Sequence, residues 1–79
     1  MKVFLAGATG VVGHRLAILL RQAGHQVTGT TRSEGKVASL QAIGVVPVVV
    51  DAYDADRLKQ AVQAAQPDVI IHQLTDLPD

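Results

Sequence analysis

Three glycines recur at intervals of three residues near the beginning of the chain, at Gly7, Gly10 and Gly13. A short apolar run precedes them and a helical pattern follows, which is the context that a phosphate-binding turn requires. Gly7 permits a tight turn, Gly10 lets backbone approach a diphosphate without an intervening Cβ, and Gly13 lets the helix pack closely on the strand. The unpaired amides and the dipole at the helix start favour an anion. The motif therefore predicts dinucleotide binding, and the alternative is a glycine turn required only for packing.

The residues that follow the second predicted strand, residues 26–30, determine which dinucleotide is expected. An NAD-binding protein places an acidic residue here to accept the hydroxyls of the adenosine ribose, whereas the 2′-phosphate of NADP requires a cation and repels a carboxylate. This sequence has Thr31 and then Arg32. A guanidinium binds phosphate through two parallel hydrogen bonds and also stacks on adenine. We therefore predict NADP rather than NAD, and the alternative is that Arg32 is a solvated loop cation.

The elements that must position these residues follow from apolar patterning. Strands are predicted over residues 2–6, 26–30, 48–50 and 69–72. The first helix is expected to end near residue 23, with Gly24 just past its end. The second is expected to run from Ser33 as its N-cap to Gly44, and the third to be capped by Asp54 or Asp56. Alternating strands and helices imply parallel pairing with right-handed crossovers. The expected fold is an α/β, Rossmann-like doubly wound parallel sheet with four strands in the order 3-2-1-4.

The composition restricts the possible partners. The 79 residues carry seven Lys and Arg against seven Asp and Glu, a formal net charge of zero, and no cysteine. A basic surface for nucleic acid or an acidic membrane is therefore not expected, and disulfides, thiolate zinc sites and thiol redox chemistry are excluded. The apolar run from Val45 to Val50 is far too short to span a bilayer. We expect a cytoplasmic protein that binds neither nucleic acid nor membrane.

The titratable side chains give little indication of a second site. The three histidines are scattered along the sequence, so no metal site is predicted. Asp51, Asp54 and Asp56 could form an acid/base or magnesium cluster. Capping of the helix that follows accounts for one or both of the last two, which makes catalysis there the weaker hypothesis.

The segment Gly7-Ala8-Thr9-Gly10-Val11-Val12-Gly13 resembles the glycine motif of the extended and atypical short-chain dehydrogenase/reductase superfamily, in its NAD-dependent epimerase/dehydratase branch. The resemblance covers the whole chain, including the stretches 23–27, 50–51 and 69–72. It implies that the three glycines surround the pyrophosphate of the cofactor. It also implies that Thr9, with the N–H groups of Val11 and Val12, binds the same group.

The resemblance assigns further roles outside the glycine motif. Thr31 stands where the family usually has its acidic ribose-binding residue. Asp51 matches the acidic residue that contacts the adenine amino group in such proteins, with Ala52 beside it. The topology, rather than the resemblance, places His72 at the end of the fourth strand beside the cofactor crevice, and Thr75 could hydrogen-bond the cofactor or belong to an ordinary strand-end loop. The residues after His72 are larger than those usual in the family.

The catalytic Tyr-x-x-x-Lys pair of the superfamily is not found in the sequence, whose only tyrosine, Tyr53, is followed four positions later by Arg57. No catalytic residue is therefore predicted. The resemblance implies the N-terminal cofactor-binding portion of a longer oxidoreductase or epimerase/dehydratase, which transfers hydride between nicotinamide and a small-molecule substrate. Two alternatives stay open, a non-catalytic dinucleotide-sensing regulator and a minimal βα module without activity.

The predicted fourth strand, residues 69–72, has an apolar sequence and would lie at an edge of the sheet. Only the third helix would cover that face, because the crossover into the fourth strand passes on the side opposite the first two helices. An exposed apolar edge is a template for pairing with another chain. We expect the chain to self-associate through this edge.

Overall fold

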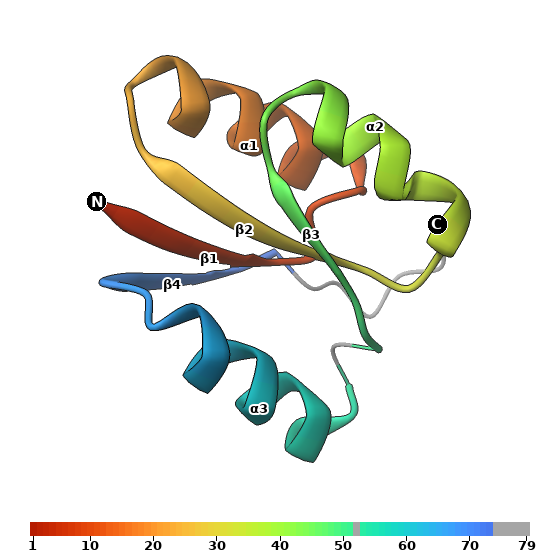
Figure 1. Ribbon diagram of the computed structural model, residues 1–79. Helices are drawn as coiled ribbons and strands as arrows, with labels where there is room; N and C mark the ends of the chain where they lie inside the picture. Colours follow the sequence, from red (N-terminus) through yellow and green to blue (C-terminus); the bar gives the residue numbers. More distant parts are fainter. Residues whose placement is uncertain (52, 74–79) are drawn as a thin grey trace.

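Four strands alternate with helices in the computed structural model, which describes residues 1–51 and 53–73 (Figure 1). The strands are β1 (Lys2–Ala6), β2 (Gln26–Thr31), β3 (Val46–Val49) and β4 (Val69–His72). The helices are α1 (Val11–Gln22), the 3-10 helix η1 (Glu34–Lys36), α2 (Val37–Ala42) and α3 (Ala55–Ala65). This alternation is the one predicted from apolar patterning.

The strands form one parallel sheet in the order β3-β2-β1-β4. Figure 1 shows α1 and α2 on one face of the sheet and α3 alone on the other. The predicted Rossmann-like, doubly wound α/β fold with strand order 3-2-1-4 is confirmed. Because the chain proceeds from β1 toward β2 on one side and returns to β4 on the other, the topological switch point lies at the carboxyl ends of β1 and β4.

The face covered by α1 and α2 holds the packed core. Gly29 lets the side chains of Ala8 and Val45 pack directly against the backbone of β2, because a Cβ on Gly29 would lie 2.6 Å from the Ala8 Cβ and 3.0 Å from a Val45 methyl. Partly buried side chains of α1 and β4 pack around this centre. The buried cluster consists of Leu5, Ala8, Ala17, Val27, Leu40 and Val45.

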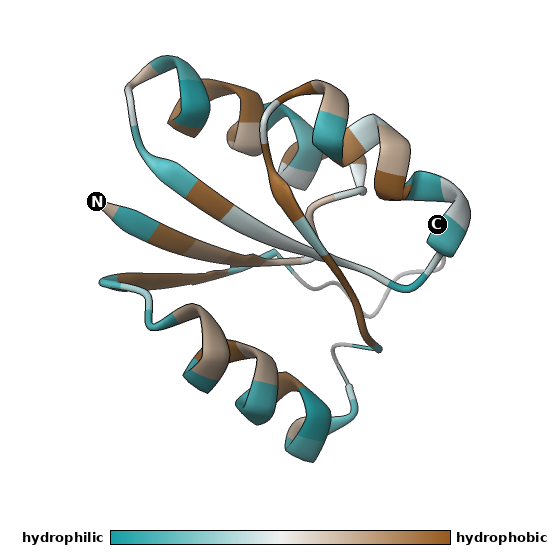
Figure 2. Cartoon of the chain, in the orientation of Figure 1, coloured by the Kyte–Doolittle hydropathy of each residue, from teal (hydrophilic) through white to brown (hydrophobic). Residues whose placement is uncertain are grey.

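The opposite face is packed loosely. None of the residues of α3 is buried, although its apolar side chains Leu58 and Val62 point along one side. Figure 2 shows hydrophilic and hydrophobic residues alternating along this helix. A mainly apolar groove of about 380 Å³ runs between α3 and the strands, lined in part by Phe4, Ile70 and His72. The expectation that α3 alone would cover this face is confirmed.

Two strand boundaries differ from the prediction. β2 continues to Thr31, and β3 spans Val46–Val49 rather than 48–50. Pro47 was expected at the entrance of the third strand but lies within it, paired with Gly29. A proline is tolerated there because β3 is an edge strand, so its missing N–H breaks no ladder on the outer side. The pairing of Thr28 with Val46 starts the strand two residues earlier than predicted.

The predicted helix caps are confirmed at two positions and changed at one. Asp54 is the N-cap of α3 and its side chain accepts a hydrogen bond from the Arg57 N–H, while Asp56 stands in the first turn. Gly24, with φ of 91°, follows the C-cap of α1 as expected. Ser33 precedes η1, not a regular helix, and its side chain makes no capping hydrogen bond.

Candidate dinucleotide site

Each glycine of the turn lacks a side chain for a different reason. Gly7 has φ of 89°, a left-handed conformation that strains other residues. A Cβ on Gly13 would collide with the Gly7 carbonyl oxygen, so α1 packs directly against the turn. Gly10 has φ of −69°, and a Cβ on it would meet nothing within 4 Å. The chain's own packing and backbone therefore do not require glycine at position 10, whereas a diphosphate lying in that open space would.

The first backbone N–H groups of α1 have no hydrogen-bond acceptor among the described residues. Its N-cap, Gly10, provides no side-chain hydrogen bond, and its first turn holds no acidic residue. The first amide with a partner is that of His14, which donates to the Gly10 carbonyl at 2.8 Å. In residues 1–51 and 53–73 no acceptor is found for the N–H groups of Val11 and Val12. Free amides together with the helix dipole are the arrangement that favours an anion, as the glycine motif predicted for a pyrophosphate.

Thr9 and the two valines frame this site. Thr9 is half-buried, and within the described part of the chain its hydroxyl makes no hydrogen bond, so it is available to a ligand. The side chains of Val11 and Val12 are 90% and 66% exposed, although both are apolar. The turn is therefore not filled by side chains of the protein.

Sequence reasoning missed one residue of the turn, Thr30. Its hydroxyl accepts a hydrogen bond from the Gly7 N–H at 2.8 Å, and its carbonyl accepts one from the Ala8 N–H at 2.9 Å. Its side chain is 1% exposed. The available signal was a polar residue near the end of a strand that is covered on both faces, where apolar residues are usual.

The end of β2 presents Arg32 outward and Thr31 inward. Thr31 is 3% exposed, and its hydroxyl accepts a hydrogen bond from the Ser33 N–H at 3.1 Å. The side chain predicted to replace the acidic ribose-binding residue is therefore occupied in a local turn. Arg32 is exposed, and within the described residues it forms no ion pair. The guanidinium is thus available to a phosphate at the edge of the sheet where the glycine turn also lies.

Asp51 and His72 stand at the same carboxyl edge, Asp51 two residues after the end of β3 and His72 as the last residue of β4. Asp51 is exposed, and one of its carboxylate oxygens accepts the Tyr53 N–H at 3.0 Å. His72 pairs with Ala6, the residue before the glycine turn, and it lines the apolar groove on the α3 side. The topology therefore brings both predicted residues to the crevice edge. Ala52 and Thr75 lie outside the described residues.

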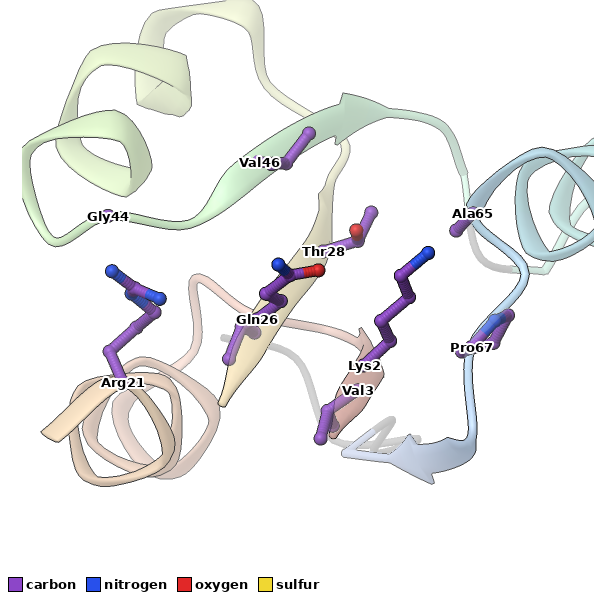
Figure 3. Close-up of a pocket in the computed structure, with 10 residues that line it drawn as sticks. Lys2, Val3, Arg21, Gln26, Thr28, Gly44, Val46, Ala65 and Pro67 are labelled. Atoms are coloured by element: carbon purple, nitrogen blue, oxygen red, sulfur yellow. The ribbon is translucent and has the colours of Figure 1, made fainter. Parts of the chain in front are cut away.

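A second groove of about 380 Å³ lies at the opposite, amino edge of the sheet (Figure 3). Lys2 and Gln26 at the starts of β1 and β2 line it, together with Arg21 in the last turn of α1. Arg21 is already used there, because its guanidinium donates to the His25 carbonyl at 2.9 Å. This groove contains none of the predicted cofactor residues. Among the residues described, no group of three His, Asp or Glu side chains is placed to hold a metal ion.

Residues 3–77 match the family model described as the NAD dependent epimerase/dehydratase family. The matched segment contains the whole glycine turn and all four strands except Lys2, the first residue of β1. The chain belongs to this family. The expected resemblance is confirmed, and membership in a family of NAD-dependent proteins agrees with the open, glycine-lined anion site at α1.

Two curated relatives of this epimerase/dehydratase family chain carry the names of reductases. One, a 3-diazoavenalumate denitrifying reductase from Streptomyces sp, is 43% identical over 98% of this chain and 24% of its own length. The other, a 2-alkyl-3-oxoalkanoate reductase from Shewanella oneidensis, is 36% identical over 87% of this chain and 17% of its own length. The chain thus spans about a quarter or less of these relatives.

A solved structure shows the same fold. The UDP-glucose-4-epimerase from Stenotrophomonas maltophila, with bound NAD and formylated UDP-arabinopyranose, superposes with a TM-score of 0.81 at 24% identity. The superposition covers 100% of this chain and 25% of that chain. The family match and the names of the curated relatives do not favour the two alternatives, the non-catalytic sensor and the minimal module. In the described part of the chain, the helices are too short or too polar to cross a bilayer.

Proposed function

We propose that the chain binds NAD(P), as the cofactor-binding portion of an oxidoreductase or epimerase/dehydratase. The observation that carries the proposal is Gly10, whose missing side chain leaves open space directly beside the unpaired amides of α1. A diphosphate placed there would accept hydrogen bonds from Val11 and Val12 and would benefit from the helix dipole. The family membership supports the same ligand.

Within this proposal, the chain's residues bind and orient the cofactor. The three glycines, Thr9 and the amides of α1 would hold the pyrophosphate, and Asp51 and Ala52 would lie near the adenine. His72 and Thr75 are proposed at the nicotinamide side of the crevice. When bound, the nicotinamide supplies the hydride chemistry. The names of the curated relatives make reduction of a small-molecule substrate the activity that we propose for the whole protein.

We further propose that NADP is preferred over NAD. The supporting observation is an exposed Arg32 at the end of β2, beside a threonine instead of a carboxylate. A guanidinium in this position can pair with the 2′-phosphate, and no acidic side chain stands at position 31 to repel it. Lys36 in η1 is exposed as well, and we interpret it as a surface charge rather than a phosphate ligand.

Calorimetric titration with NADP, NAD, ADP and adenosine 2′,5′-bisphosphate tests both proposals, the binding of NAD(P) and the preference for NADP. The chain is expected to bind the dinucleotides and ADP, and to bind NADP more tightly than NAD. Arg32→Ala is expected to weaken NADP about tenfold, the loss of one charge-assisted contact, while NAD changes little. Equal losses for the two cofactors would refute the preference. A chain that binds none of the four ligands would refute the function itself.

A second copy of the chain is the partner that we propose for β4. Val69 and Ile70 on this edge strand are 36% and 46% exposed, and the apolar groove under α3 continues from Ile70. Pairing β4 with its counterpart in another copy would cover both features. Light scattering at high protein concentration is expected to give twice the mass of one chain, and a uniform monomer would contradict this. The cytoplasmic location stays a prediction from the sequence.

A further inference from the structure

Thr30 joins the second strand to the glycine turn through two hydrogen bonds. Its hydroxyl receives the Gly7 N–H and its carbonyl receives the Ala8 N–H, at 2.8 and 2.9 Å. One residue, 23 positions away in the sequence from Gly7, therefore fixes two consecutive amides of the turn. Because the Thr30 side chain is almost completely buried, solvent provides no ready substitute for this hydroxyl.

Gly29, the residue before Thr30, contacts the same part of the turn through close packing. A Cβ on Gly29 would lie 2.6 Å from the Ala8 Cβ, so the Ala8 methyl occupies the space that this glycine leaves. Ala8 is fully buried in the core. The backbone of Gly7 and Ala8 is thus fixed to β2 both by packing against Gly29 and by the hydrogen bonds to Thr30.

We infer that Thr30 is a positioning residue for pyrophosphate binding, an inference that rests on the proposed dinucleotide function. Thr30 turns the amides of Gly7 and Ala8 toward β2 and holds Gly7 at its left-handed φ of 89°. The Gly7 carbonyl in turn faces Gly13, the third residue of α1. Through these contacts, Thr30 sets where the amino end of α1 begins, and therefore where the free amides of Val11 and Val12 lie.

Replacing the Thr30 hydroxyl with a methyl group distinguishes the positioning role of the hydroxyl from an effect of side-chain packing. Thr30→Val keeps the shape of the side chain but leaves the Gly7 N–H without an acceptor in a partly buried position, so the turn must shift to satisfy it. Thr30→Ser restores the hydroxyl. Thr28→Val is the matched control, because Thr28 lies two residues earlier on β2, is half-buried, and makes no hydrogen bond through its hydroxyl within the described residues.

The test is calorimetric titration of ADP into the wild type and the three variants, well below their unfolding temperatures. Thr30→Val is expected to weaken ADP binding about tenfold, the effect of one hydrogen-bond donor left unpaired. Thr30→Ser should recover most of the affinity, and Thr28→Val should bind as the wild type does. In NMR spectra, the Gly7 amide proton should move upfield and exchange faster in Thr30→Val but not in the other two variants.

The outcomes separate this inference from the proposed function. If the wild type binds ADP and Thr30→Val binds it equally well, the positioning role is wrong and dinucleotide binding stands. An equal loss in Thr28→Val and Thr30→Val would also overturn the role, since it would indicate a general effect on the strand. A wild type that binds neither ADP, NAD nor NADP would overturn both proposals.

Discussion

The helices α1 and α3 lie on opposite faces of the sheet and are stabilised in opposite ways. α1 buries Gly13 and Ala17 against the sheet and the turn, but its N-cap has no side-chain hydrogen bond. α3 has no buried residue, but Asp54 caps its N-terminus and Asp56 adds a negative charge to its first turn. The chain thus satisfies the amino end of α3 by itself and leaves that of α1 unsatisfied.

This difference shows where the chain is prepared for a ligand. An uncapped helix end lowers the stability of the free protein, and packing along α1 compensates for it. The same packing fixes the position of the free amides, so an arriving anion meets an arranged site rather than a fraying helix end. α3 needs no such arrangement, because its first turn already carries its own anions.

The largest expected effect is on the free energy of unfolding, and it compares the sides of α1 and α3 that face the sheet. Ala17→Leu in α1 should lower the free energy of unfolding by about 1–3 kcal/mol, because the added atoms have no space in the core. Ala61→Leu in α3 makes the same change at a partly buried position on the open face, and it should alter stability by about 0.5 kcal/mol or less. Denaturant unfolding measures both. Equal losses would show that the two faces are packed alike.

A smaller effect is expected at the capped end of α3. Asp54→Ala removes the acceptor of the Arg57 N–H and should lower the free energy of unfolding by about 1 kcal/mol. ADP affinity, measured by calorimetry on the same sample, should change little, because Asp54 is not itself a predicted cofactor residue and the substitution keeps its backbone N–H, which donates to the Asp51 carbonyl. A loss of ADP binding in Asp54→Ala would mean that α3, too, takes part in the site.

The glycine turn and the order of the strands were predictable because local rules and packing require the same residues there. Position 7 requires glycine because its φ is positive, and position 13 requires glycine because α1 packs directly against the Gly7 carbonyl. The alternation of strands with helices allows few topologies. Gly10 was predicted for its role toward a ligand, and the space beside it is open as that role requires.

The remaining details depend on neighbours that a single sequence does not reveal. Pro47 lies inside β3 only because that strand is at the edge of the sheet. Thr30 reads as an ordinary strand residue until Gly7 is seen beside it. Thr31 ends β2, and the sequence does not reveal that its side chain is buried and forms a turn with Ser33.

The most direct measurement gives α1 the kind of cap that α3 already has. In Gly10→Asp the new carboxylate occupies the open space, accepts the free amides of α1 and repels a diphosphate. We predict an unfolding midpoint equal to or above that of the wild type, together with loss of ADP binding by calorimetry. Gln60→Glu, on the exposed side of α3, makes the same change in charge and should bind ADP normally. ADP binding by Gly10→Asp with wild-type affinity would contradict the assignment of this helix end as the pyrophosphate site.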